Sequence, residues 1–296
     1  MTSIDASARH DLTDAQWALL EPLLPAPPVR GRPRRYPLRA MIDAVRWRTR
    51  VGAPWRDVPA RYGPWWRARA LYRARQLNGV WERIEAALVA RADAAGKIDW
   101  RVSVDSTAVR ARAPRERGPA GTASSAWRGS RTTTPWDGPG ADGAPRPRAA
   151  VEAGLGAGSL LLTAGQAGDC PMMIPVLEAI SVKRPARGRP RTRPDRVLAD
   201  RAYSSRANRD WLRAHHIRAT IPVKADQAAN RRRRGGAGGR PPAFDPDVHE
   251  DRNAVERGFS RLGHNRGLAT RYDKLAVRYR TTTRIAAIDH WLKRLT

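Results

Sequence analysis

The sequence predicts an α/β protein that begins with an all-helical domain. Apolar residues at helical spacing dominate the first 92 residues, and segments of alternating apolar and polar residues appear after residue 96. These later segments are separated by helix-like stretches, which is typical of an α/β layer structure. Because 296 residues are enough for two domains of roughly 100 to 200 residues, we predict a helical domain over residues 1–92 and an α/β domain over residues 93–296.

The helical domain is expected to start with a helix that Thr13 or Asp14 caps and that stops before Pro25. A second helix is expected in LRAMIDAVRWRTRV, where Gly52 follows as the end signal. After two Pro-containing turns, PWWRARALYRARQLNGVWERIEAALVARA reads as further helix.

Short helices separated by tight turns suit a helix-turn-helix module whose later helix enters a DNA groove. One of these helices carries Arg67, Arg69 and Arg73 together with aromatic residues, so we take the three arginines as candidate DNA contacts. The alternative is a small helical bundle whose arginines only solvate an outer face.

Four strands are expected in the second domain. KIDWRVSVDSTAV alternates with period two and is predicted to end as a strand at Asp105. The other three are SLLLTAGQ at 159–166, DRVLAD ending at Asp200, and a segment starting at Ile217.

Two tracts interrupt this pattern. Residues 118–159 contain nine Gly and five Pro in 42 residues, without strand-like alternation, and are expected to be loop or disorder. Residues 230–242 form a second expected loop, in which Arg231, Arg232, Arg233 and Arg234 stand beside glycines. This basic loop is either an ordinary solvated surface loop or a phosphate-binding arm.

The charge indicates a polyanionic partner. The chain has 56 Lys and Arg against 28 Asp and Glu, a formal net charge of +28. A GC-rich genome would contribute arginines but would not explain the shortage of acids. Cys170 is the single cysteine, and neither an export signal nor a membrane span is apparent, so we expect a cytoplasmic, nucleoid-associated protein.

Three carboxylates are candidate ligands of metal ions. Asp105 and Asp200 each end a predicted strand, and Glu256 lies in the helical segment DRNAVERGFSRL with Arg252 four residues before it on the same face. Such a set is able to hold two Mg²⁺ ions for phosphodiester chemistry. From spacing alone, ordinary strand-end carboxylates and a helical Glu–Arg pair are the favoured interpretation, because any α/β protein of this size contains both.

Several motifs, in order, resemble the DDE transposases of bacterial insertion sequences, in the group named after insertion sequence five: VSVDSTAVRA, TAGQAGD, RPDRVLADRAYSSR, KADQAANRRRRG, GGRPPAFD and LATRYDKLAVRY. The N-terminal LTDAQWALLEPLLP and GRPRRYPLRAMIDAVRWRTRVGAPWRDVP also look like that group. The resemblance implies a ribonuclease-H-like core in which Asp105, Asp200 and Glu256 bind two Mg²⁺ or Mn²⁺ ions and catalyse cleavage. It also implies double-stranded DNA as the partner, with contacts that include Arg252 and Lys274, and a homodimer in the synaptic complex.

The implied function is binding of terminal inverted repeats, followed by DNA strand cleavage and strand transfer. The chain departs from the group's signature at His249, which takes its tyrosine position, and at Gly263, which takes its lysine position. Pro135 follows GSRTTT where the second strand should begin, so that strand is expected to be missing. The alternatives are therefore a decayed transposase that only binds DNA, or a nuclease that cuts without transferring.

Overall fold

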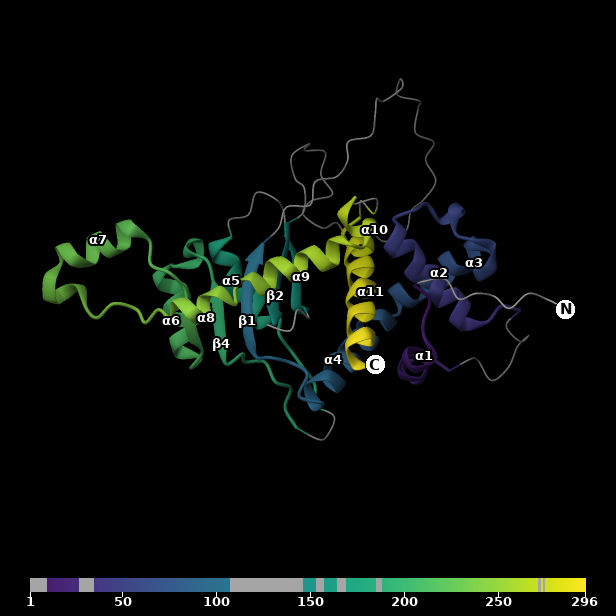
Figure 1. Cartoon of the computed structure of the whole chain (residues 1–296), viewed down its shortest axis with the longest axis horizontal. Coiled ribbons are helices and arrows are strands. Elements are labelled where there is room, and N and C mark those ends of the chain that lie inside the picture. The colour runs from purple at the N-terminus through teal and green to yellow at the C-terminus, as the bar shows by residue number, and fades with distance from the viewer. Residues whose placement is uncertain are drawn as a thin grey trace, which may run out of the picture.

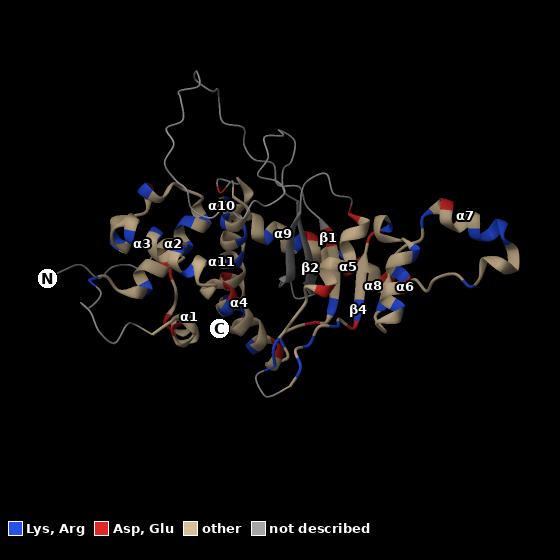
Figure 2. Cartoon of the chain, turned by 180° about the vertical axis from the view of Figure 1, so that it is seen from behind, with Lys and Arg blue, Asp and Glu red and all other residues tan. Residues whose placement is uncertain are grey.

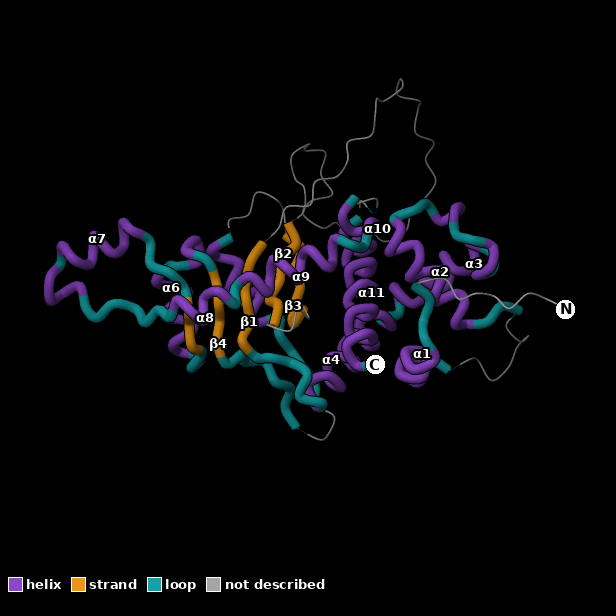
Figure 3. Tube along the Cα trace, viewed as in Figure 1, coloured by secondary structure: helices purple, strands orange, loops and turns teal. Residues whose placement is uncertain are grey.

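The structure is a computed structural model that describes residues 10–26, 35–106, 146–152, 157–163, 169–184, 188–270, 273 and 275–296. Along its long axis, a helical part lies at one end and a five-stranded sheet lies toward the other (Figures 1 and 3). The helical part contains α1 (Asp14–Leu20), η1 (Glu21–Leu23), α2 (Leu38–Val51), η2 (Trp55–Asp57), η3 (Ala60–Tyr62), α3 (Trp65–Leu77), α4 (Val80–Ala94), α10 (Arg266–Ala269) and α11 (Ala276–Leu295).

Capping residues mark the start of the first helix and the end of the second. Thr13 caps α1, and its side chain and that of Gln16 form a reciprocal capping box, which confirms the predicted start. Gly52 ends α2 in the left-handed conformation with φ of 72°, which also agrees with the sequence. A 3₁₀ turn, η1, carries the first helix as far as Leu23.

The helical part includes α11, although α11 belongs to the C-terminal end of the chain. It packs against α4 and α2, and its buried Trp291 and Leu292 join the same apolar core as Ile42 and Leu88. This core also continues into the sheet through Val102. The residues before position 92 therefore share one core with residues that the sequence analysis assigned to the second domain.

Buried ion pairs fix α2 to the C-terminal segment. Arg46, 6% exposed, pairs with Asp43 and with Asp289 of α11. Arg48 donates two hydrogen bonds to Asp273, of 2.8 and 3.1 Å, and Thr282 donates a third to the same carboxylate. Because a buried charge without a partner is costly, these pairs make the packing of α11 on α2 specific.

The sheet has the strand order β3-β2-β1-β4-β5. Its strands are β1 (Arg101–Ser106), β2 (Arg146–Glu152), β3 (Ala157–Thr163), β4 (Arg196–Ala199) and β5 (Arg218–Thr220). The first three strands pair antiparallel, and β4 and β5 extend the sheet in parallel from β1. The strands expected near residues 98–105, 159–166, 196–200 and 217 are all present.

The expectation that the second strand is missing is wrong. Residues 146–152, inside the tract expected to be loop, form β2 and pair with β1 on one side and with β3 on the other. Their sequence, RPRAAVE, shows no alternation, and Pro147 lacks an amide hydrogen for the ladder. Hydrogen bonds from two neighbouring strands impose the extended conformation here, which local propensity could not reveal. Residues 118–145 lie outside the described residues.

The basic tract at 230–242 is also partly helical rather than a loop. Helix α7 (Ala225–Arg233) continues into η6 (Gly235–Gly238), and only the residues after Gly238 run as loop. Asp226 lies in the first turn of α7 and arginines lie in its last turn, so the charges match the helix dipole. Gln227 anchors the helix through hydrogen bonds with Ser204.

Helices cover both faces of the sheet. One face carries α9 (Asn253–Gly263), which packs on β1 and β2 and crosses in front of them in Figure 1. The opposite face carries α5 (Met173–Glu178), preceded by η4 (Cys170–Met172), and α6 (Arg206–Ala214), preceded by η5 (Arg201–Tyr203). The short α8 (Pro246–Glu250) leads into α9.

Within the residues that the structure describes, no helix is both long and apolar enough to cross a membrane.

Candidate active site

Asp105 and Asp200 lie on neighbouring parallel strands. Val104 of β1 is in register with Ala199 of β4, and each Asp is the next residue along its chain. The carboxyl ends of adjacent parallel strands meet at one edge of a sheet, where side chains leave a rigid element for solvent. Asp200 also accepts a 2.8 Å hydrogen bond from the Ala202 amide and so caps η5.

Glu256 reaches the same region through Arg252. The Arg252 guanidinium lies 3.7 Å from the Asp105 carboxylate and 3.1 Å from the Glu256 carboxylate, one helical turn away. The Asp105 and Arg252 side chains are about a quarter exposed, at 24% and 23%, whereas that of Glu256 is 57% exposed. The structure therefore brings Arg252, Asp105 and Glu256 together, with Asp200 on the strand beside Asp105.

His249 also lies at the site, which the sequence did not indicate. Its imidazole lies close enough to Asp200 and Arg252 for both charges to act on it, and it hydrogen-bonds to the backbone of Thr220. Burial lowers the pKa of His249 below 6.5, and the positive charge of Arg252 lowers it further. A histidine at the tyrosine position of the signature was visible in the sequence, but its proximity to Asp200 depends on how α8 packs.

The residue types in the site suit a divalent cation, whereas their present arrangement does not form a ligand cluster. Carboxylate oxygens are the ligands that Mg²⁺ and Mn²⁺ prefer. Within the described ranges, however, no three His, Cys, Asp or Glu side chains are grouped closely enough to hold a metal ion. Arg252 is instead the cation that faces Asp105 and Glu256.

The predicted arginines of α3 lie on its outer surface. Arg67, Arg69 and Arg73 are exposed, and the Arg67 guanidinium lies over the exposed Trp66 ring at 4.6 Å. Tyr72 of the same helix is only 5% exposed and faces the core instead. A basic, aromatic outer face is present on this helix, although the packing of α2 and α3 does not establish a helix-turn-helix.

The second group of predicted arginines lies at the opposite end of the molecule, on and just after α7 (Figures 1 and 2). Arg232, Arg233 and Arg234 are exposed and Arg231 is half-buried. Lys274 lies outside the described residues. The two groups of candidate DNA-binding arginines thus flank the sheet rather than forming one patch.

Comparison with known proteins places this architecture in a family. Residues 197–293, which include Asp200 and Glu256, match the family model described as "Transposase DDE domain". Residues 12–85 match the model described as "Putative transposase of IS4/5 family". An "Insertion element IS402 uncharacterized 16.2 kDa protein" of Burkholderia cepacia is 38% identical over 35% of this chain and 76% of its own length.

The chain belongs to the IS4/5 family of transposases. Two further relatives match a similar share of this chain. Uncharacterized protein y4sN of Sinorhizobium fredii is 33% identical over 34% of this chain and 76% of its own length. A "Putative transposase for insertion sequence element IS402" of Burkholderia cepacia is 33% identical over 39% of this chain and 47% of its own length. No solved structure matches the chain.

Membership of the family confirms the resemblance seen in the motifs. The mixed five-stranded sheet, together with the DDE-domain match, is consistent with a ribonuclease-H-like core. DDE transposase domains generally use divalent metal ions and act on DNA. This agrees with the excess of basic residues, because a net charge of +28 favours a phosphate-rich partner.

Proposed function

We propose that this transposase binds the terminal inverted repeats of an insertion sequence and catalyses metal-dependent DNA strand cleavage and strand transfer. The observation that carries the proposal is the placement of Asp105 and Asp200 at the same end of two adjacent parallel strands, with Glu256 joined to Asp105 through Arg252. Two carboxylates at one edge of a sheet and a third on the helix that packs against it suit phosphodiester chemistry.

Asp105, Asp200 and Glu256 would hold two Mg²⁺ or Mn²⁺ ions, which supply activation of a water or a 3′-hydroxyl and stabilise the leaving oxygen. Arg252 lies between two of these carboxylates and is placed to neutralise them or to contact a DNA phosphate. No covalent bond between protein and DNA is required, because water and then the freed 3′-hydroxyl serve as nucleophiles.

DNA binding is the role we propose for the exposed arginines of α3 and of the α7 region, which lie on both sides of the sheet. Each arginine that meets a phosphate releases counterions, so affinity should fall as salt rises. The proposed site of action is the nucleoid, and the proposed active assembly is a homodimer that joins two element ends.

A cleavage assay with Asp105→Asn, Asp200→Asn and Glu256→Gln tests the proposal, in Mg²⁺ and in Mn²⁺, on DNA carrying the element ends. Each variant is expected to lose cleavage by at least about a hundredfold, because each carboxylate would hold metal, while DNA binding stays within a few-fold of the parent.

Glu178→Gln is the matched control, since Glu178 is an exposed carboxylate on α5, on the opposite face of the sheet. It should cleave like the parent. Cleavage at the parental rate by any one of the three variants would remove that residue from the site. Cleaved ends that never join a target would reduce the proposal to a nuclease.

The presence of β2 removes the main reason for treating this copy as decayed.

A further inference from the structure

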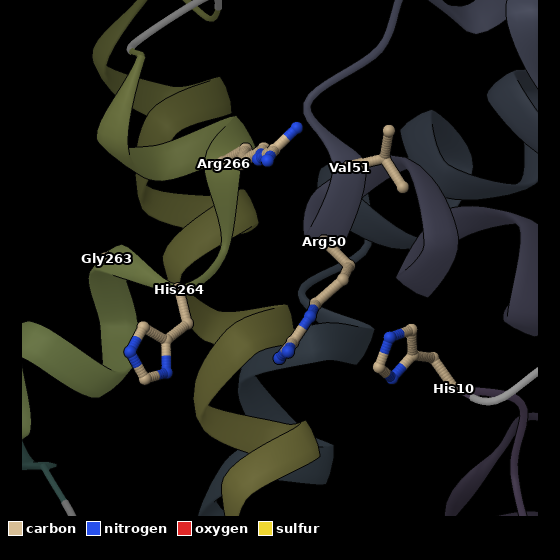
Figure 4. Close-up of a pocket in the computed structure, with 6 residues that line it drawn as sticks. All are labelled: His10, Arg50, Val51, Gly263, His264 and Arg266. Atoms are coloured by element: carbon tan, nitrogen blue, oxygen red, sulfur yellow. The ribbon is translucent and has the colours of Figure 1, made fainter.

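A basic cleft lies between the end of α2 and the turn that joins α9 to α10 (Figure 4). Its volume is about 630 Å³, and its lining residues are His10, Arg50, Val51, Gly263, His264 and Arg266. In Figure 4, Arg50 and His10 come from the N-terminal part of the chain, and His264 and Arg266 come from the C-terminal part. Two separate segments thus supply basic side chains to one hollow.

The lining residues have the composition of an anion site. Two are arginines and two are histidines, and the described lining includes no carboxylate. Within the described part of the chain, the guanidinium groups of Arg50 and Arg266 take part in no ion pair, whereas Arg46 and Arg48 of the same helix are both paired. Cations held near one another repel, and a bound phosphate relieves that repulsion.

The two walls of the cleft are fixed to each other by close backbone contact. A Cβ on Gly52 would lie 2.8 Å from the backbone of Arg266 and of Gly267, and Gly52 has the left-handed φ of 72°. A Cβ on Gly267 would lie 2.8 Å from the carbonyl oxygen of Thr49. Only glycines allow this approach, so the contact sets the spacing of the two backbone segments that carry Arg50 and Arg266.

Helix α9 connects the candidate active site to the cleft. Helix α9 carries Glu256 near its start and ends at Gly263. Seven residues at 1.5 Å each separate them by roughly 10 Å along the helix, or about three steps of 3.4 Å along a DNA strand. A strand that lies at the carboxylates can therefore reach the cleft within a few nucleotides.

We propose that this cleft binds the phosphodiester backbone of the DNA strand that enters the candidate active site, with Arg50 and Arg266 as the phosphate contacts. The proposal rests on the proposed function, because it assumes DNA at Asp105 and Glu256. It adds a phosphate site shared between the helical part and the end of α9, separate from the arginines of α3 and α7.

The test is a salt titration of DNA binding by the full chain, in which binding is measured by fluorescence anisotropy. The labelled duplex has roughly 30 base pairs and an arbitrary sequence, since phosphate contacts do not depend on sequence. Arg50→Gln with Arg266→Gln should reduce the slope of log affinity against log salt by about 2 and weaken binding at least about tenfold at low salt. The matched control is Arg206→Gln with Arg213→Gln, which removes the same charge from two exposed arginines of α6. That control should keep the parental slope.

Gly263→Lys gives a test by gain of binding. A Cβ at this position meets nothing within 4 Å, so the new side chain fits and should increase the slope by about 1. If the parent binds DNA and the double cleft variant keeps the parental slope with an unchanged melting temperature, the cleft proposal is wrong and the proposed function stands. If the parent does not bind DNA at all, both are wrong.

Discussion

The Arg252 guanidinium lies 3.7 Å from the Asp105 carboxylate, although the two residues stand on different elements, at the N-cap of α9 and near the end of β1. Arg252 also pairs with Glu256 at 3.1 Å. One cation therefore partly neutralises two of the three candidate metal ligands. A divalent cation that binds these carboxylates has to compete with Arg252 for them.

Replacement of Arg252 should therefore strengthen metal binding. For Arg252→Gln we expect Mn²⁺ to bind roughly three to ten times more tightly, because a competing positive charge is gone. Electron paramagnetic resonance of free Mn²⁺ during a titration measures this without any need for activity. Arg261→Gln, an exposed arginine farther along α9, is the control and should leave Mn²⁺ affinity near the parental value. Weaker Mn²⁺ binding by Arg252→Gln would show instead that Arg252 orients the carboxylates.

The ion pair between Arg48 and Asp273 should be needed for stability. Both side chains are at most 10% exposed, so Asp273→Ala leaves a buried guanidinium without its carboxylate and should cost about 3 to 5 kcal/mol in a urea unfolding experiment. Asp210→Ala, which breaks an exposed pair with Arg213, should cost less than about 1 kcal/mol.

The double variant Arg48→Met with Asp273→Leu separates charge from packing. It should recover most of the loss, because apolar side chains of similar volume need no partner. A single Asp273→Ala variant as stable as the Asp210→Ala control would contradict the role that we give to this pair. A fragment ending at residue 92 would lack both Asp289, which pairs with Arg46, and Asp273, which pairs with Arg48.

Glu85 of α4 should make stability depend on pH near neutrality. Burial raises the pKa of Glu85 from 4.5 to about 7, and the neighbouring Glu82 contributes, against the opposing effect of Arg284. The folded state then holds the Glu85 proton more tightly than the unfolded state does. Stability from this group is present below about pH 4.5 and is lost as pH rises through about 7, by at most about 3 kcal/mol.

Glu85→Gln should remove this dependence. The melting temperature of the variant, relative to the parent, should increase between pH 5 and pH 8, because only the parent has to ionise a partly buried carboxylate. Differential scanning calorimetry at several pH values provides the comparison, with Glu178→Gln as an exposed control that shows no such trend. A variant that loses stability at pH 8 would mean that the 3.5 Å pair with Arg284 outweighs the cost of burial.

Local sequence was sufficient for elements whose ends have their own chemical signals. Thr13 with Gln16 marks the start of α1, and Gly52 marks the end of α2, because capping and left-handed backbone depend on residues within one turn. The strands that lead to Asp105 and Asp200 were also predictable. In the first, apolar Val102 and Val104 alternate with polar residues, and in the second, Val197, Leu198 and Ala199 form a short apolar run. The family followed from motifs along almost the whole chain.

Long-range contacts decided what the sequence analysis missed. RPRAAVE at 146–152 is a strand because β1 and β3 hydrogen-bond to it from both sides, and the helical tract after Lys224 is anchored by Ser204. Neither effect has a local signal. The expectation of loop was therefore wrong over residues 146–152 and 157–159 and over most of 230–242, where only the residues after Gly238 run as loop.

The sequence by itself determined the family, the charge that favours DNA and the three candidate carboxylates, because each depends on residue identity in short segments. Only the tertiary structure decided that Arg252 faces Asp105, that α11 closes the N-terminal helices and that Arg50 and Arg266 line one cleft. These relationships join residues far apart in the chain. They arise when burial of the common apolar core selects one packing of the elements, and no short segment carries that information.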